Sequence, residues 1–265
     1  MNFKERLNLV QDILSDCPYE TQKEKIIELF KITKNNVKED ILLRLFVIDS
    51  CYSTNMNRRL FGFEELIDLI LKIDSQLNEN INIEKFIEIN FKLLNHNIGI
   101  DKKGNSKGHA FSLITKYIYF RTKFNFPIYD RLVYDGLVEE KLIKRPKHQR
   151  QEPSPKYFKK LIDIKDKYNI TFDDLDKYFW VCGKVREGNL SLLISDIKSY
   201  NNDFLDKLNL DKEEQKLKSD KFNEKLSEKL VSEKELFDNS KLKKVQKLAK
   251  SIKNERVFDN LNLMD

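Results

Sequence analysis

GHAFSLITKYIYF, residues 108–120, is followed after five residues by FPIYDRLV, residues 126–133. A helical projection of the first stretch separates an apolar side from a polar side, which holds Ser112, Thr115, Lys116 and Tyr119. The polar side faces either solvent, with Lys116 extending into water, or a functional site. The second stretch is an apolar, Pro-stiffened approach to a helix start at Asp130. Asp130 is therefore either a helix cap alone or a group that takes part in chemistry.

Apolar residues recur at helical spacing along most of the chain, whereas period-2 alternation is scarce. The clearest stretches are FKERLNLVQDIL (3–14), TQKEKIIELFKI (21–32), VKEDILLRLFVI (37–48), FEELIDLILKI (63–73) and IEKFIEINFKLL (83–94). With only 7 Gly and 5 Pro in 265 residues, tight turns are few, and an all-α fold is expected.

No apolar run approaches the length of a membrane span, and the N-terminus MNFKERLN lacks a signal-peptide core. A cytoplasmic protein with no membrane partner is therefore expected. Cys17, Cys51 and Cys182 are odd in number and lack metal-ligand spacing, so neither a disulfide framework nor a zinc site is indicated. We expect no metal and no cofactor.

The basic charge is concentrated around Asp130. Residues 102–160 hold 15 Lys or Arg against 5 Asp or Glu, a net of +10, whereas residues 201–265 have a net of +1, with 15 against 14. Such a field attracts a polyanion, and nucleic acid is the commonest one. A solvated, Lys-rich surface in a chain of biased composition explains the charge equally well.

The chain divides into a helical body, residues 1–200, and a charged helical extension, residues 201–265. Two loops interrupt the body at residues 95–109 and 143–156. The second is an exposed basic strap that could lie along a phosphate backbone through Lys144, Arg145, Lys147 and Arg150. The extension has sparse apolar residues at helical spacing and is expected to stand apart from the core as a candidate partner-binding element, with Leu226, Leu230, Leu242, Val245 and Ile252.

NITFDDLDKYFWVCGK, residues 169–184, has the signals of a helix with an N-terminus at Thr171 and an end at Gly183. The single tryptophan, Trp180, lies within this helix. Core packing is its ordinary role, and a wall for a stacked base is the functional alternative.

Four stretches resemble the helix-hairpin-helix DNA glycosylases, in particular a group of bacterial proteins similar to 8-oxoguanine glycosylases. The group's patterns are S-x-x-[ST]-K-[YF], then F-P-I-Y-D, then a Trp-containing segment ending in G-K. A Ser- and Asn-rich turn followed by Arg precedes them. The matching stretches are YSTNMNRR (52–59), SLITKY (112–117), FPIYD (126–130) and YFWVCGK (178–184), and the resemblance covers residues 37–190.

The chain departs from the family at the hairpin, which usually reads like L-P-G-V-G; here it offers only GNSKG (104–108). Lys107 and Lys116 precede Asp130 by 23 and 14 residues and bracket the spacing of the family's nucleophile. Lys107 matches its place at the hairpin, and Lys116 matches the bacterial subgroup, so both stay candidates.

The resemblance implies base excision from duplex DNA. A carboxylate, Asp130, would stabilise positive charge on the sugar, and Lys116, Lys107 or water would attack C1′. Trp180 and Ser112 would line the base pocket.

The resemblance also implies an element that fills the gap left by the extruded base. Asn55 and Asn57 would fill it, with Arg58 or Arg59 donating to the unpaired base or to a phosphate. A helix-ending cap is the plain alternative for Asn55.

The sequence therefore predicts an all-α, helix-hairpin-helix glycosylase-type fold with a Lys-rich C-terminal helical extension. The expected function is a DNA glycosylase, with or without AP-lyase activity, that removes a damaged or modified purine such as 8-oxoguanine. Two alternatives remain: a non-catalytic DNA-binding module, and an interaction protein whose coiled tail engages a protein partner.

Overall fold

The computed structural model describes residues 1–15, 18–52, 54–144, 154–186, 239–254 and 257–258. Within these ranges every named element is a helix, and the expected all-α class is confirmed. The α-helices are α1 (Phe3–Leu14), α2 (Pro18–Ile32), α3 (Lys38–Tyr52), α4 (Gly62–Ile73), α5 (Ile83–Leu94), α6 (Phe111–Arg121), α7 (Arg131–Glu139), α8 (Pro155–Tyr168), α9 (Phe172–Arg186) and α13 (Asn239–Asn254). Two short 3-10 helices are η1 (Met56–Arg58) and η2 (Asp74–Gln76).

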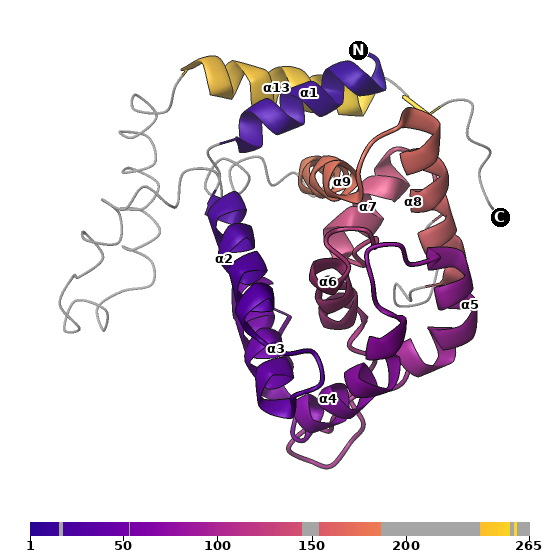
Figure 1. Cartoon of the computed structure of the whole chain (residues 1–265). Coiled ribbons are helices and arrows are strands. Elements are labelled where there is room, and N and C mark those ends of the chain that lie inside the picture. The colour runs from indigo at the N-terminus through magenta and orange to yellow at the C-terminus, as the bar shows by residue number, and fades with distance from the viewer. Residues whose placement is uncertain (16–17, 53, 145–153, 187–238, 255–256, 259–265) are drawn as a thin grey trace.

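Helix α6 lies at the centre of the fold, with α2 and α3 along one side and α5 and α8 along the other (Figure 1). Nine of its eleven residues are buried, including the polar Thr115 and Lys116. A helix that is surrounded in this way has no solvent face. The polar side seen in the sequence therefore faces neighbouring helices, and the interpretation of Lys116 as a side chain extended into water is wrong.

Helices α7 and α9 pack unusually closely because each carries a glycine at the contact. A Cβ atom on Gly136 of α7 would lie 2.1 Å from the Phe179 carbonyl oxygen, and one on Gly183 of α9 would lie 2.2 Å from that of Leu132. Only glycine permits such an approach. Gly183 was expected to end its helix, but α9 continues to Arg186, and the residue instead fixes the first turn of α7 against α9.

The described part of the C-terminal extension does not stand apart from the body. Helix α13 lies beside α1 (Figure 1) and packs on α1 and α9. The expectation of a separate appendage therefore fails for this helix, because its apolar stripe is used for packing on the body. The residues it buries are Val245, Leu248, Ala249 and Ile252, and Phe258 beyond it is buried as well. Leu226 and Leu230 lie outside the described residues.

A buried arginine joins three parts of the fold. Arg6 of α1 is fully buried and donates to Ser251 Oγ at 3.1 Å and to the Ser251 carbonyl oxygen at 2.9 Å. It also donates to Glu140 Oε1 at 2.8 Å, which accepts a further hydrogen bond from the Tyr178 hydroxyl at 2.7 Å. Burial raises the pKa of Glu140, although Tyr178 and Arg6 both act to lower it. The ion pair thus ties α13 and α1 to the end of α7.

Replacing Arg6 with Leu should lower the free energy of unfolding by about 3 kcal/mol or more, because Glu140 is left buried without its charge partner. Urea unfolding of the full chain measures this, and Lys4→Leu, on the exposed side of the same helix, is the control. Equal stabilities of the two variants would show that the buried Arg6–Glu140 ion pair does not stabilise the fold.

No helix within the described ranges is both long and apolar enough to cross a membrane. In the same ranges no three or more His, Cys, Asp or Glu side chains are grouped so that they could hold a metal ion.

Candidate active site

Lys116 and Asp130 are in direct contact. Lys116 is 2% exposed, and its Nζ lies 3.0 Å from Asp130 Oδ2. The same nitrogen donates to Ser112 Oγ, one helical turn away, at 2.7 Å, and lies 5.3 Å from the centre of the Tyr52 ring. Two of the three predicted catalytic residues therefore meet, together with the predicted pocket residue Ser112.

Asp130 is both a helix cap and a member of this cluster. Its Oδ1 accepts a hydrogen bond from the Leu132 amide at 2.8 Å, and its Oδ2 accepts one from Lys116. Burial raises the pKa of the Asp130 carboxyl, but Lys116, the Leu132 amide and Arg131 outweigh it, so the pKa lies below its usual range. With 28% of the side chain exposed, the ionised carboxylate is reachable from solvent.

The apolar approach to Asp130 is held on two sides. The Tyr129 amide donates to Thr115 Oγ1 of α6 at 2.9 Å, and the Tyr157 hydroxyl of α8 donates to the Ile128 carbonyl oxygen at 2.7 Å. Phe126, Ile128 and Tyr129 are all buried. These contacts fix the position of the Asp130 carboxylate, which lies one residue beyond the buried segment.

Helix α9 contributes a charged face that sequence reasoning missed. Asp173, Asp176, Lys177, Trp180 and Lys184 recur at spacings of one to three turns and fall on one side of the helix. Trp180 is half-buried, and Lys184 Nζ lies 5.1 Å from the centre of its ring. Trp180 thus shares its side of the helix with charged groups and is not enclosed in the core.

Asp176 is coupled electrostatically to the Lys116 and Asp130 pair. Burial and the charge of Asp130 together raise the pKa of Asp176 to about 7, although Lys116 opposes the rise. A carboxyl with a pKa near neutrality exchanges protons readily at physiological pH. The spacing of Asp176 to Trp180, one helical turn, was the only signal in the sequence that could have identified it.

A second ion-pair network joins α2, α6 and α9. Asp173 accepts hydrogen bonds from Lys23 of α2 and from the Tyr119 hydroxyl of α6, the latter at 2.7 Å. Lys177 bridges Asp173 at 3.0 Å and Glu20 at 2.5 Å. Lys23 and Asp173 are 150 residues apart in sequence, so no local pattern could have paired them. The network holds the charged face of α9 against α6.

Lys107 lies apart from this cluster. It belongs to the loop between α5 and α6, where its amide donates to the Gly99 carbonyl oxygen at 2.9 Å. The charge of Lys107 helps to lower the pKa of Asp101, which lies in the same loop. The charges that lower the pKa of Asp130 are instead those of Lys116 and Arg131. Of the two candidate nucleophiles, only Lys116 contacts Asp130.

Residues 55–59, the predicted gap-filling turn, follow the end of α3. Asn55 is exposed, with a left-handed backbone at φ 62°, and Arg58 is exposed as well. Asn57 falls in η1. Arg59 points inward and donates to the carbonyl oxygens of Ile98, at 3.0 Å, and Gly108, at 2.5 Å. Arg59 therefore supports the loop between α5 and α6. Of the two arginines, Arg58 is the one whose side chain is exposed to solvent.

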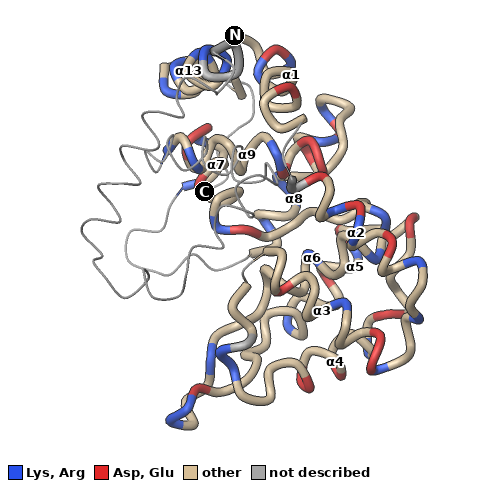
Figure 2. The backbone as a smooth tube through the Cα atoms, turned by 90° about the vertical axis from the view of Figure 1, so that its left-hand side faces the viewer, with Lys and Arg blue, Asp and Glu red and all other residues tan. Residues whose placement is uncertain are grey.

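Of the predicted basic strap, Lys144 is exposed. Arg145, Lys147 and Arg150 lie outside the described residues. Along the described chain, Lys and Arg alternate with Asp and Glu over most helices, and the loop between α5 and α6 carries its lysines at the lower end of the molecule (Figure 2).

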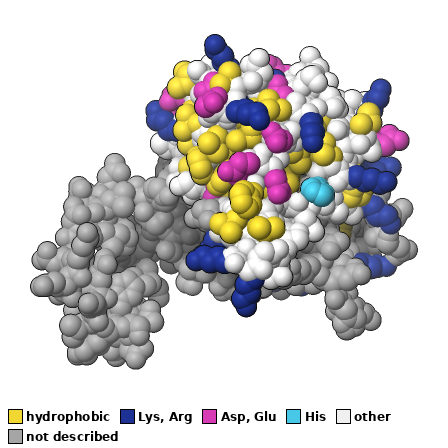
Figure 3. All heavy atoms as spheres, turned by 90° about the horizontal axis from the view of Figure 1, so that it is seen from below, with side chains coloured by type: hydrophobic (Ala, Val, Ile, Leu, Met, Phe, Trp, Pro, Cys, Tyr) yellow, Lys and Arg dark blue, Asp and Glu magenta, His cyan; other side chains and the backbone are white. Residues whose placement is uncertain are grey.

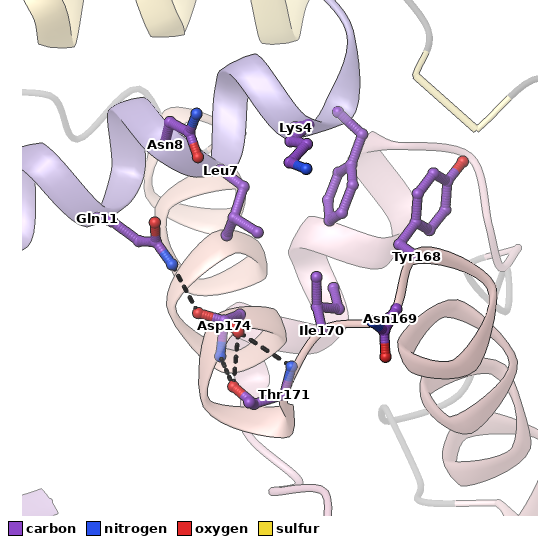
Figure 4. Close-up of a pocket in the computed structure, with 10 residues that line it drawn as sticks. Lys4, Leu7, Asn8, Gln11, Tyr168, Asn169, Ile170, Thr171 and Asp174 are labelled. Atoms are coloured by element: carbon purple, nitrogen blue, oxygen red, sulfur yellow. Dashed lines mark hydrogen bonds between the residues drawn. The ribbon is translucent and has the colours of Figure 1, made fainter.

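A separate pocket of about 380 Å³ lies between α1 and the junction of α8 and α9 (Figure 4). It contains none of the predicted site residues. Gln11 donates to Asp174 at 2.8 Å, and Asp174 also caps α9 with Thr171, as expected for that helix start. The residues that line the pocket are Phe3, Lys4, Leu7, Asn8, Gln11, Tyr168, Asn169, Ile170, Thr171 and Asp174.

Residues 2–124 match a family model named HI_0787_N, which is described as an N-terminal domain. The match covers less than half of the chain; it includes Lys116 and ends before Asp130. No curated protein and no solved structure matches the chain.

Proposed function

We propose that this protein is a DNA glycosylase with AP-lyase activity that removes a damaged or modified purine, such as 8-oxoguanine, from duplex DNA. The observation that carries the proposal is the contact of Lys116 Nζ with Asp130 Oδ2 at 3.0 Å. The two residues come from two of the four stretches that resemble the glycosylase family, SLITKY and FPIYD.

Asp130 supplies the negative charge that the reaction needs. Breaking an N-glycosidic bond builds positive charge on the sugar, and a fixed carboxylate stabilises that charge more in the transition state than in the ground state. Asp130 is ionised at neutral pH because its pKa is lowered, and it is held by the start of α7. It would lie next to C1′ of the extruded nucleotide.

Lys116 supplies the nucleophile. An amine that has lost its proton can attack C1′ as the base departs, and the product rearranges to an imine that opens the strand by elimination. The Lys116 ammonium group must first give up a proton. Asp176, whose pKa is about 7 and whose charge is coupled to that of Lys116, is the group that we assign to accept it.

Trp180 supplies a surface for the extruded base. It lies one turn beyond Asp176 on the same side of α9, and its half-buried ring leaves area for stacking. Stacking on an aromatic side chain is a common way to hold a base that has left the helix.

The pH dependence of base release tests the role of Asp176. Because its pKa is about 7, the carboxyl gains a proton as the pH falls, and it then no longer accepts one from Lys116. The single-turnover rate of the wild type should fall by about tenfold per pH unit below 7. Asp176→Asn should be slow at pH 8 and change little between pH 8 and 6.

Thermal unfolding of the same two proteins is the control for folding. A pKa of about 7 in the folded state, against an ordinary 3.8, means that the folded state binds the proton more tightly. Wild-type stability therefore falls as the pH rises through this window, and Asp176→Asn should gain stability relative to the wild type over the same range. Identical pH profiles of rate for the two proteins would exclude Asp176 from the proton transfer.

The competing function is a DNA-binding module in which Lys116 and Asp130 form only a structural ion pair. Both functions predict binding to duplex DNA. Release of a free purine from a lesion-bearing duplex by the full-length wild type separates them, because the binding module releases nothing.

A further inference from the structure

Helix α13 carries the largest charge of a single sign among the described helices. Its 16 residues, NSKLKKVQKLAKSIKN, hold six Lys and neither Asp nor Glu. Figure 2 shows this helix with Lys but without the acidic residues that mark most other helices. The face seen from below, at the far end of the molecule from α13, mixes Asp and Glu with Lys, Arg and apolar side chains (Figure 3). The unmixed basic charge is therefore a feature of α13 and not of the surface in general.

Four of these lysines form a stripe on the outer side of the helix. They are exposed and recur at spacings of four, three and three residues, which places them on one side: Lys243, Lys247, Lys250 and Lys253. Within the described residues none of the four makes an ion pair or a hydrogen bond. This lysine stripe is about 15 Å long, at about 1.5 Å of helix per residue.

The other sides of α13 are taken up by the body. Its apolar side is buried, and Ser251 accepts a hydrogen bond from the buried Arg6 at 3.1 Å. Lys244, beside the lysine stripe, pairs with Asp12 of the neighbouring helix α1. Glu5, the other acidic residue of α1, is engaged in the capping box at the start of that helix. The lysine stripe is thus held in place, and both acidic residues of α1 already have partners.

The lysine stripe opposes the stability of its own helix. Like charges three or four residues apart on a helix repel each other. No ion pair within the described part of the chain offsets the three repulsions along the stripe. A local cost with no structural gain is typical of a functional surface.

The surroundings of the lysine stripe favour a nucleic acid over a protein or a membrane. A protein interface needs an apolar anchor at its centre, but the exposed described side chains of α13 are all polar: Lys243, Gln246, Lys247, Lys250, Lys253 and Asn254. A basic helix binds a membrane through a free apolar face, and that face of α13 is buried on the body. One DNA strand carries a charge about every 3.4 Å along its axis, so about four phosphates lie along the stripe.

We propose that the lysine stripe of α13 binds the phosphate backbone of duplex DNA, as a contact outside the candidate active site. The proposal rests on the proposed function for its DNA partner. It gives α13 a nucleic-acid role in place of the protein partner expected of the extension. Helix α9, which carries Asp176 and Trp180, packs on α13 and joins the lysine stripe to the candidate active site.

The test measures how binding of the full-length protein to a lesion-free duplex depends on salt, by fluorescence anisotropy. Each phosphate contact contributes about 0.9 to the slope of log affinity against log salt. Changing all four stripe lysines to Gln should therefore reduce the slope by about 2–4. The same variant should bind at least about tenfold more weakly at about 100 mM salt. Its melting temperature should equal or exceed that of the wild type, because the repulsion along α13 is gone.

The matched control removes four exposed lysines from α2, α4 and α5 by changing them to Gln: Lys31, Lys72, Lys85 and Lys92. It should change the slope by less than about 1. Replacing the four stripe lysines with Arg keeps their charge and should keep the wild-type slope. An unchanged slope in the stripe Gln variant, an equal fall in the control, or a loss of slope in the Arg variant would overturn the proposal.

Two further measurements separate the remaining outcomes. Binding of the wild type to vesicles that contain phosphatidylserine, lost in the stripe Gln variant while duplex binding stays unchanged, would assign the lysine stripe to a membrane surface and overturn the proposal. Base release by the wild type from a lesion-bearing duplex reports separately on the proposed function. A stripe-dependent slope without base release supports the DNA contact and removes the glycosylase, and base release with a stripe-independent slope does the reverse.

Discussion

We expect Asp130→Asn to lower the single-turnover rate of base release by about a hundredfold or more, because it removes the preorganised charge opposite the sugar. Asn still accepts the hydrogen bond of the Leu132 amide through Oδ1 and caps helices about as well as Asp, but its Nδ2 group cannot accept the hydrogen bond that Lys116 donates to Asp130 Oδ2. The buried Lys116 loses its charge partner, however, and we expect a loss of about 1–3 kcal/mol in the free energy of unfolding. Rates are therefore measured at a temperature where the variant is fully folded.

Asp173→Asn is the matched control for this experiment. Asp173 is also a partly buried, ion-paired carboxylate, bonded to Lys23, Lys177 and Tyr119, but it does not contact Lys116 in the described network. We expect a comparable loss of stability with a much smaller loss of rate. Equal rates for the Asp130 and Asp173 variants would reduce Asp130 to a helix cap.

The second large effect concerns Lys116. Borohydride should trap a covalent complex between the wild type and lesion-bearing DNA, since reduction fixes the imine of the lysine with C1′. Lys116→Gln should abolish trapping and strand opening altogether, and Lys116→Arg should do so as well, because its guanidinium stays charged.

Lys107→Gln removes the other candidate lysine, which lies in the loop between α5 and α6 without contact to Asp130. It should trap as well as the wild type. Loss of trapping with Lys107→Gln and not with Lys116→Gln would move the nucleophile to the hairpin. Base release with no trapping in any protein would make water the nucleophile.

The local elements of this fold could be predicted from sequence because their signals are local. The spacing of apolar residues predicted the helices, Asp130 caps α7 as proposed for one of its roles, and Thr171 begins α9 with Asp174. The motifs SLITKY and FPIYD carry Lys116 and Asp130, the two side chains that the fold brings into contact.

The remaining features depend on contacts between distant segments. A helical projection shows the polar side of α6 but not that helices cover it, so it cannot distinguish a solvated Lys116 from a buried one. Gly183 looked like a helix end because the partner that needs it, Leu132, lies 51 residues earlier in the chain. Arg59 turns inward to bond the Ile98 carbonyl oxygen, and α13 packs on α1 through the bond from Arg6 to Ser251. Both contacts join segments that are far apart in the sequence. Asp176 had no motif of its own, and burial beside Asp130 is what distinguishes it.

The most direct test of the central claim is release of free base by the full-length wild type, under single-turnover conditions, from a panel of duplexes that each carry one modified purine. The proposed function predicts that at least one duplex, with 8-oxoguanine the leading candidate, loses its modified base while the unmodified duplex stays intact. It also predicts that Asp130→Asn, tested on that same duplex, releases the base at least about a hundredfold more slowly. Binding of every duplex with release from none would contradict the glycosylase and leave a DNA-binding protein whose Lys116 and Asp130 serve the fold alone.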